Sequence, residues 1–215
     1  MLTGAIKRKQ SPYNYLSNFI GSKMEPNDSN NLFFSDVDKL DLMVRRIKNG
    51  DDNAFREFFF LMQPCIYRYL YRYLCNQNSA EDLTQETFVK FWIHRKQLDP
   101  SFSPKSYLYR IARNLALNHI KRNHPISQSR LSKVDYLTAY LNPEENYDQF
   151  FFLDEFQRAV SDLPERCRAT FILCKYEGFK YSEIADILDV SLQTVKNQMN
   201  KAISVLKKLL SSHLS

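Results

Sequence analysis

The sequence predicts an all-α protein built of two helical domains. Apolar residues recur at intervals of three and four along most of the chain, whereas the strict apolar–polar alternation typical of β-strands is scarce. Glycine, which weakens helices, occurs only 4 times among 215 residues. A polar stretch in the middle divides the helical patterns into two groups, and the chain is long enough for two domains with separate hydrophobic cores.

The N-terminal part of the chain differs from the rest. Residues 1–35 are rich in Ser, Asn and Lys and have little periodicity, so we expect a flexible extension there. The first helical pattern starts near Asp36 and ends at Asn49-Gly50, a typical helix end. Asp51 begins a second helix with many aromatic residues. Because these fall at helical spacing, packing in a core explains them better than stacking on nucleotides.

The segment from Asn78 to Trp92 predicts a helix with one apolar face and one mixed face. Ser79, with Asp82 three residues later, resembles the capping box that begins many helices. The mixed face combines carboxylates, an amide and an apolar side chain: Asp82, Gln85, Glu86 and Val89. Such a stripe is either simply solvated or a docking surface for the helices of another protein.

The next predicted helix begins at Ser103-Pro104, a serine cap followed by proline in the first turn. Its outward side is basic and rich in amides, with an aromatic residue near its start: Tyr107, Arg110, Arg113, Asn114, Asn118, Lys121 and Arg122. Cations, amides and aromatics together suit single-stranded DNA, whose bases are unstacked and accessible. The alternative is an ordinary basic surface helix.

A polar segment, residues 125–149, is the predicted flexible linker between a first domain, residues 36–124, and a second domain, residues 150–215. A group of acids from Asp135 to Glu155 lies between two stretches that contain no Asp or Glu. These run from Ser101 to Val134 and from Val190 to the end. The distribution predicts two separate basic surfaces, each suited to a DNA contact.

The second domain contains the pattern of a helix-turn-helix, from Tyr181 to Lys196. Ser182 is expected to cap the first helix and Ser191 the second, with a turn at Asp189-Val190 between them. The outer face of the second helix carries a hydroxyl, amides and lysines but no acid: Gln193, Thr194, Lys196, Asn197, Asn200 and Lys201. Amides bind adenine and lysine binds phosphate or guanine, so this helix is expected in a DNA major groove. The alternative is an ordinary amphipathic hairpin.

Composition excludes several other classes of function. The net charge of +6 suits a nucleic-acid partner. The 4 cysteines form no Cys-x-x-Cys pair and have no histidine at zinc-finger spacing, so we expect small buried thiols and no metal site. No phosphate-binding glycine loop and no nucleophile–base pair is present, which predicts no cofactor, no small-molecule substrate and no enzyme. Without a signal peptide or a membrane-length apolar run, a cytoplasmic protein is expected.

Three segments together resemble the extracytoplasmic-function (ECF) sigma factors of the bacterial sigma-70 superfamily, and most closely their iron-citrate type. Ala80–Phe88 is similar to the family's region 2.2, Ser106–Asn114 to regions 2.3 to 2.4, and Leu163–Arg166 with Tyr181–Lys201 to region 4. The resemblance spans roughly Asp36 to Leu210. It implies a region 2 domain and a region 4 domain, the latter with the C-terminal helix-turn-helix.

The resemblance also implies partners and roles. Asp82, Gln85, Glu86 and Val89 would bind core RNA polymerase. The outward side of the basic helix, from Tyr107 to Arg122, would lie along the promoter's melted −10 element, and the loop from Lys96 to Phe102 would help to capture a flipped base. The outer face from Ser191 to Lys201 would bind the −35 duplex. A membrane-linked anti-sigma factor would hold the protein inactive until a signal arrives.

Two observations qualify the resemblance. The family often has Gly after the turn and Arg along the recognition helix, where this chain has Leu192-Gln193 and Asn197 to Asn200. The sequence preference at −35 is therefore not implied. The alternative function is a stand-alone helix-turn-helix regulator with an N-terminal sensing domain, but a sensing domain gives no reason for a second acid-free basic helix.

Overall fold

A computed structural model describes residues 33–98, 103–122 and 156–211 of the chain. These residues form helices joined by short loops and include no strand, which confirms the all-α prediction. The helices are α2 (Phe33–Lys48), α3 (Asp52–Leu74), α4 (Gln77–Ile93), a 3-10 turn (Arg95–Gln97), α5 (Pro104–Arg122), α7 (Glu165–Lys175), α8 (Tyr181–Leu188) and α9 (Leu192–Ser211). The predicted linker and residues 1–32 of the predicted extension lie outside the described residues.

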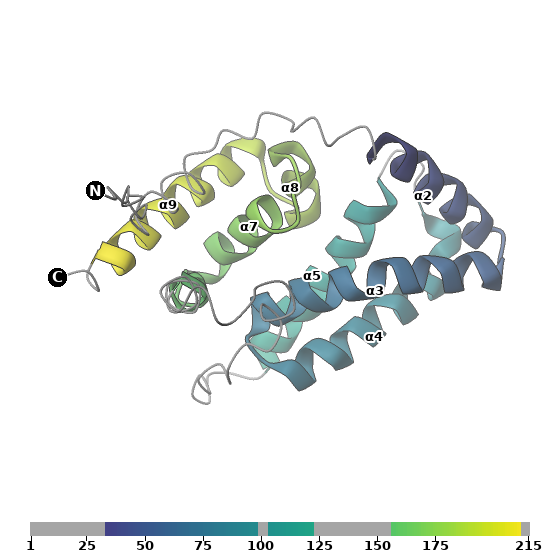
Figure 1. The fold of residues 1–215 in the computed structure, drawn as a ribbon, viewed down its shortest axis with the longest axis horizontal. Coiled ribbons are helices and arrows are strands. Elements are labelled where there is room, and N and C mark those ends of the chain that lie inside the picture. The colour runs from purple at the N-terminus through teal and green to yellow at the C-terminus, as the bar shows by residue number, and fades with distance from the viewer. Residues whose placement is uncertain (1–32, 99–102, 123–155, 212–215) are drawn as a thin grey trace, which may run out of the picture.

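Helices α2 to α5 pack together (Figure 1), and the core between them is rich in aromatic residues. Phe58 of α3 is fully buried and stacks on Phe91 of α4, with ring centroids 4.9 Å apart. The ring of Phe88 meets Phe58 edge-on at 6.3 Å, and Tyr69 meets Tyr109 of α5 at 5.2 Å. These contacts confirm that aromatic residues at helical spacing build the core of the first domain.

The helix ends agree with the sequence at some positions and differ at others. The Asp51 carboxylate accepts hydrogen bonds from the backbone of Asn53 and Ala54, as expected of a cap. The start of α4 was predicted wrongly: Asn76 is the cap, accepting from the Ser79 backbone at 2.8 Å, so Ser79 lies inside the helix. The Asn76 side chain, three residues upstream, accepts the hydrogen bond of the Ser79 backbone amide, so the helix begins at Gln77 and not after Ser79.

Helices α7 to α9 form the second domain, and α8 and α9 are the predicted helix-turn-helix. Its core joins α7 to α9 through fully buried Phe171, Ile172, Val195 and Leu206. The cap of α8 was predicted wrongly, because the helix begins at Tyr181 and Ser182 lies within it. The Glu183 carboxylate accepts from the backbone of Lys180 at 2.8 Å and thereby caps the helix.

The cysteines are not uniformly buried. Cys167 and Cys174 are buried, but Cys65 and Cys75 are only partly buried, so the expectation of four buried thiols is wrong for these two. Burial raises the pKa of Cys75, Cys167 and Cys174, which keeps these thiols protonated.

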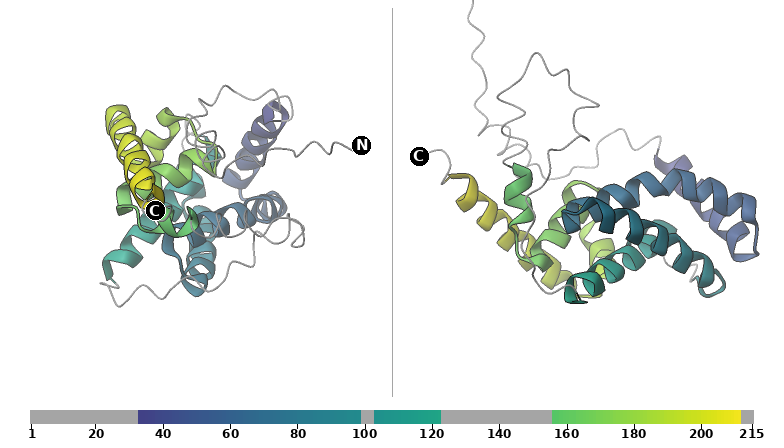
Figure 2. Two further views of the ribbon diagram at one scale, coloured as in Figure 1. Left: turned by 60° about the vertical axis from the view of Figure 1, so that its left-hand side comes forward. Right: turned by 90° about the horizontal axis from the view of Figure 1, so that it is seen from below.

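The two domains touch each other. The second domain lies against one end of the first, where α8 packs on α5 and α7 packs on α3 (Figures 1 and 2). The sequence predicted two domains and a linker but no contact between the domains.

Candidate nucleic-acid interface

The outer face of α9 is held in place by the turn before it. Asp189 adopts a left-handed conformation with φ 56°, which ends α8, and the chain then enters α9 at Ser191. The Ser191 hydroxyl accepts from the Thr194 backbone at 3.1 Å, which confirms Ser191 as the cap. The face behind is apolar, with Val195, Met199 and Ala202 buried. One side of α9 is therefore packed against its own domain, and the opposite side faces solvent.

The predicted outer-face residues of α9 lie together, and most are exposed. Gln193, Lys196, Asn197 and Lys201 are exposed, and the Gln193 amide donates to Asn197 at 3.0 Å. Thr194 is only partly exposed, because its hydroxyl meets that of Ser191 at 2.8 Å. No described residue of α9 is acidic. This surface can enter a major groove and offer amide and ammonium groups to bases and phosphates.

Gln198 is an amide of α9 that does not belong to this face. It is partly buried and accepts a hydrogen bond from Thr170 of α7 at 2.6 Å. The Thr170 side chain is itself fully buried, so the pair joins α7 to α9 through a polar contact inside the second domain. Its role is structural, and the exposed amides are left to Gln193, Asn197 and Asn200.

The predicted outward side of α5 is divided into two halves. Asn114, Asn118, Lys121 and Arg122 are exposed in its C-terminal half. In the N-terminal half, Tyr107 packs against the ring of Phe91 at 6.1 Å, and Arg110 and Arg113 are partly buried. The structure therefore does not bring the seven residues into one open surface.

The second domain covers part of this N-terminal half. Arg110 of α5 lies 3.8 Å from the Asp189 carboxylate, in the turn of the helix-turn-helix. Arg113 donates to the neighbouring Asn114 at 3.1 Å. Ser79 and His119 form a hydrogen bond of 3.1 Å between the start of α4 and the open half of α5, so that half is fixed to the first domain.

The mixed face of α4 is exposed as predicted. Asp82, Gln85 and Glu86 are exposed, Val89 is 56 % exposed, and Lys90 forms an ion pair with Glu86 at 3.2 Å. Ile93, 62 % exposed, extends the stripe by one turn, because residues 82, 86, 89 and 93 share one helical face. Carboxylates flanking two exposed apolar side chains suit a protein partner with basic and apolar groups.

Two further exposed apolar residues on α3 were missed in the sequence. Phe60 is 70 % exposed and Leu61 is 52 % exposed. The run Phe58-Phe59-Phe60 carried the signal, because three consecutive residues of a helix span about 200° and cannot all face one core.

The described residues carry no cluster of metal-binding side chains. Within residues 33–98, 103–122 and 156–211, no three His, Cys, Asp or Glu side chains are grouped to hold a metal ion. Lys96 and Gln97, at the start of the loop expected to capture a base, are exposed, whereas residues 99–102 lie outside the described part. No described helix is long and apolar enough to span a membrane.

Comparison with known proteins supports the division into two domains. Residues 61–125 match the family model for Sigma-70 region 2, and residues 153–206 match that for Sigma-70 region 4. The chain is 27 % identical over 176 residues to the ECF RNA polymerase sigma factor SigW of Bacillus subtilis, covering 78 % of this chain and 94 % of SigW. It is 35 % identical over 152 residues to SigE of Mycolicibacterium smegmatis, also named an ECF RNA polymerase sigma factor, covering 70 % of this chain and 59 % of SigE.

A solved structure shares the fold. The sigma factor RpoE from Bartonella quintana, solved in complex with the anti-sigma factor NepR, superposes with a TM-score of 0.56 at 22 % identity. The match covers 73 % of this chain and 96 % of RpoE.

Proposed function

The chain belongs to the ECF sigma-70 family and is an RNA polymerase sigma factor that directs promoter-specific initiation, and we propose how its two domains divide that work. The α4 stripe binds core RNA polymerase, the outward side of α5 binds melted −10 DNA, and the outer face of α9 binds the −35 duplex. The observation that carries this proposal is the exposed α4 stripe, on the same chain as a helix-turn-helix.

The exposed stripe on α4 is the feature that distinguishes a polymerase subunit from a stand-alone regulator. Asp82, Gln85 and Glu86 lie on a well-packed helix beside the exposed Val89 and Ile93. A helix that only covered a sensing domain would bury these two apolar residues or replace them with polar ones. Burial of such side chains against a partner contributes about 1.5–3 kcal/mol each.

The DNA roles follow from the chemistry of the two basic helices. On α9, Lys196 and Lys201 contact phosphates or guanines while Asn197 contacts adenine. On α5, Tyr107, Arg110, Arg113, Asn114, Asn118, Lys121 and Arg122 follow the unpaired strand. Each face offers only a few cations, so neither domain alone supplies much phosphate binding energy, and the two domains act together on polymerase.

Three narrower assignments are part of the proposal. The chain works in the cytoplasm, is not an enzyme, and is controlled by a membrane-linked anti-sigma factor. The solved complex of the similar RpoE with NepR supports control by an anti-sigma factor. The iron-citrate type within the family is supported by the sequence resemblance of Ala80–Phe88 and its neighbours. Release from the anti-sigma factor by a signal should raise transcription, which a reporter fused to a promoter that the chain recognises would measure.

The test is co-purification with core RNA polymerase. The double variant Asp82→Lys with Gln85→Ala should lose polymerase binding while its circular dichroism spectrum and thermal unfolding stay those of the wild type, because both residues are exposed. Asp41→Lys, a matched charge change at an exposed position of α2, should bind normally. An unchanged polymerase affinity in the double variant would contradict the role of α4. Specific promoter binding by a chain that does not bind core polymerase would favour the stand-alone regulator.

A further inference from the structure

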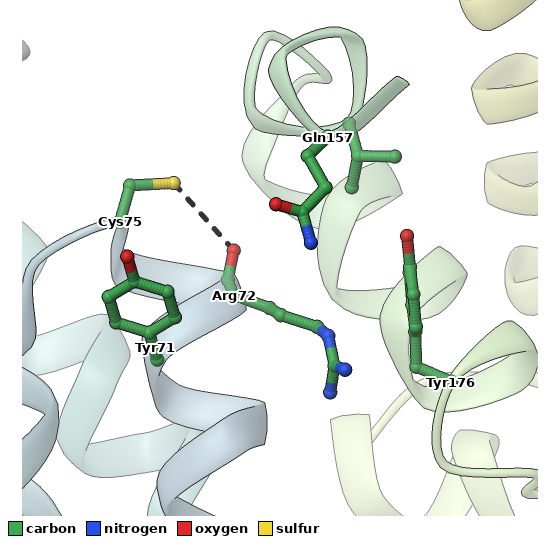
Figure 3. A pocket seen from close by; sticks show the side chains of 6 residues that line it. Tyr71, Arg72, Cys75, Gln157 and Tyr176 are labelled. Atoms are coloured by element: carbon green, nitrogen blue, oxygen red, sulfur yellow. Dashed lines mark hydrogen bonds between the residues drawn. The ribbon is translucent and has the colours of Figure 1, made fainter. Parts of the chain in front are cut away.

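The contact between the two domains is filled by groups of the protein itself. Glu177, in the loop between α7 and α8, has a side chain only 7 % exposed. Its carboxylate accepts a hydrogen bond from the Tyr109 hydroxyl of α5 at 2.6 Å, and Arg72 of α3 lies 3.5 Å away. Arg72 also extends toward Tyr176, with its guanidinium 4.5 Å from the ring centre (Figure 3). The cavity beside Arg72 measures about 30 Å³, room for one or two water molecules, so this contact offers no site for a ligand.

Leu192 is an apolar side chain on the polar outer surface of α9. It is the first residue of the helix and directly follows the Ser191 cap. Leu192 is 45 % exposed, and no other large apolar residue among residues 156–211 is exposed to this extent. A single exposed leucine is common on protein surfaces, so its meaning depends on its neighbours.

Leu192 lies at the edge of the core of the second domain. Val195, Met199 and Ala202 are buried at intervals of three and four, and Leu192 precedes this series by one turn. The turn before α9 closes this end of the core instead, because Val190 packs against the buried residues. Leu192 therefore has apolar surface that the described part of its own domain leaves uncovered.

The exposed part of Leu192 is continuous with the outer face of α9. Lys196 lies one turn further along the same side of the helix, and Gln193 is the next residue. Both are exposed members of the face that we assign to the −35 duplex. Side chains of an α-helix tilt toward its N-terminus, so Leu192 stands at the tip of α9. The N-terminal residues of a recognition helix are those that contact base edges.

The other side chains of this first turn make different contacts. The hydroxyls of Ser191 and Thr194 lie 2.8 Å apart, and that of Ser191 accepts from the Thr194 backbone, so both are engaged at the helix cap. The Gln193 amide donates to Asn197 at 3.0 Å, which holds the two amides together. The tip of α9 thus presents a pair of amides beside the methyl groups of Leu192, which neither donate nor accept hydrogen bonds.

One base offers a partner for such methyl groups in the major groove. Thymine carries a 5-methyl group there, whereas cytosine, adenine and guanine present hydrogen-bond donors and acceptors but no methyl group. Contact between the leucine and the thymine methyl removes apolar surface of both from water. A leucine placed over the amino group of cytosine would cover a donor without giving it a partner, which is unfavourable. Leucine at this position therefore favours thymine both by attraction and by exclusion.

We propose that Leu192 contacts the 5-methyl group of a thymine in the −35 element and makes thymine the required base at that position. The inference rests on the −35 role proposed for α9. Helix α9 contains no arginine, whose guanidinium binds guanine bidentately, so apolar and amide contacts carry more of its selectivity.

The test uses promoter duplexes and the complex of the chain with core RNA polymerase. The duplex carries the −35 sequence selected from a randomised promoter library. Each thymine of the −35 block is replaced in turn by deoxyuridine, which lacks only the 5-methyl group. At one position the replacement should weaken binding on the order of fourfold, as expected when one methyl-sized group is no longer buried.

Three variants assign this effect to Leu192. Leu192→Ala should bind the thymine duplex on the order of fourfold more weakly than the wild type does, and should bind the thymine and deoxyuridine duplexes equally. Leu192→Met, which keeps an apolar side chain of similar size, should keep the preference for thymine. Leu42→Ala, the matched change at a leucine 62 % exposed on α2, should keep the wild-type ratio between the two duplexes.

Failure of the methyl contact is distinguishable from failure of the −35 role of α9. Equal wild-type binding to the thymine and deoxyuridine duplexes at every position, or an unchanged thymine preference in Leu192→Ala, would overturn the contact. A selected −35 block that requires thymine at no position of either strand would overturn it as well. Loss of core polymerase binding in Leu192→Ala would show that the leucine contacts protein instead. Equal binding of the wild-type complex to selected and scrambled −35 blocks would overturn the DNA role of α9 itself.

Discussion

Helices α5 and α9 have similar surfaces but different surroundings. Both are about twenty residues long and carry basic, amide-rich outward faces without acids. The face of α9 is exposed because the rest of its own domain packs behind it, whereas the N-terminal half of the α5 face is partly buried, in part by the other domain. The difference teaches that two surfaces of similar chemistry on one chain can differ in how accessible the packing of the domains leaves them.

If each domain is stabilised by its own core, the loss of a buried ring from the first domain should have the largest effect on stability. Phe58→Ala removes a fully buried ring and should destabilise the first domain by about 3–5 kcal/mol. Phe60→Ala on the same helix, at a ring 70 % exposed, should change stability by less than about 0.5 kcal/mol. Chemical denaturation followed by circular dichroism measures both.

In Phe58→Ala the second domain should stay folded. Amide hydrogen exchange of α7 to α9 should remain slow while α3 to α5 exchange quickly. Equal loss of protection in both domains would show a single cooperative unit and would break the comparison.

The open surface of α9 gives the next largest effect. Lys196→Ala and Asn197→Ala should each weaken binding to the −35 duplex by about 1–3 kcal/mol if they contact bases. Titrations against the selected −35 duplex and a scrambled one measure the loss. Equal losses on the two duplexes would mean that these side chains contact only phosphates.

The buried tyrosines at the contact between the domains should lower the stability of the protein at alkaline pH, by less than the changes described above. Burial raises the pKa of Tyr176 to about 12, with Arg72 opposing the shift. The unfolded chain releases this proton near pH 10, before the folded protein does. The stabilisation is therefore complete below about pH 10 and is lost between pH 10 and 12. At pH 11 the loss is about 1 kcal/mol for this residue. Denaturation at pH 9 and pH 11 checks the direction, and Tyr176→Phe should reduce the difference.

The smallest expected effect concerns the ion pair between α5 and the turn of the helix-turn-helix. Arg110 is 36 % exposed and Asp189 is 84 % exposed, so the pair contributes about 0–1 kcal/mol to the contact between the domains. Asp189→Asn should therefore lower the free energy of unfolding by less than about 1 kcal/mol, as measured by chemical denaturation. A larger loss would show that this ion pair, rather than the contacts of Glu177, holds the domains together.

The sequence predicted α9 well because its information is local. The Ser191 cap, the buried Val195 and Met199, and the exposed Lys196 all follow from spacing along one helix. The errors at Ser79 and Ser182 have a local cause as well, since a nearby polar side chain, Asn76 for α4 and Glu183 for α8, caps each helix instead. Cap positions shift easily because several nearby side chains can satisfy the same amides.

The contact around Glu177 could not be predicted in this way. Tyr109 precedes Glu177 by 68 positions, and Arg72 precedes it by 105, so no window along the chain includes both partners. In the sequence Glu177 looks like a solvated loop residue, and Tyr109 looks like a core aromatic. Only the packing of the second domain on α3 and α5 brings them together.

Run-off transcription from a randomised promoter library tests the central claim most directly, that this chain is a specificity subunit whose two domains bind −35 and −10 DNA on polymerase. Core polymerase with the chain should yield transcripts whose promoters share two conserved blocks at those positions, and core polymerase alone should not. Lys196→Ala with Asn197→Ala should alter only the upstream block. Transcripts without conserved blocks, or the same blocks from core polymerase alone, would contradict the account.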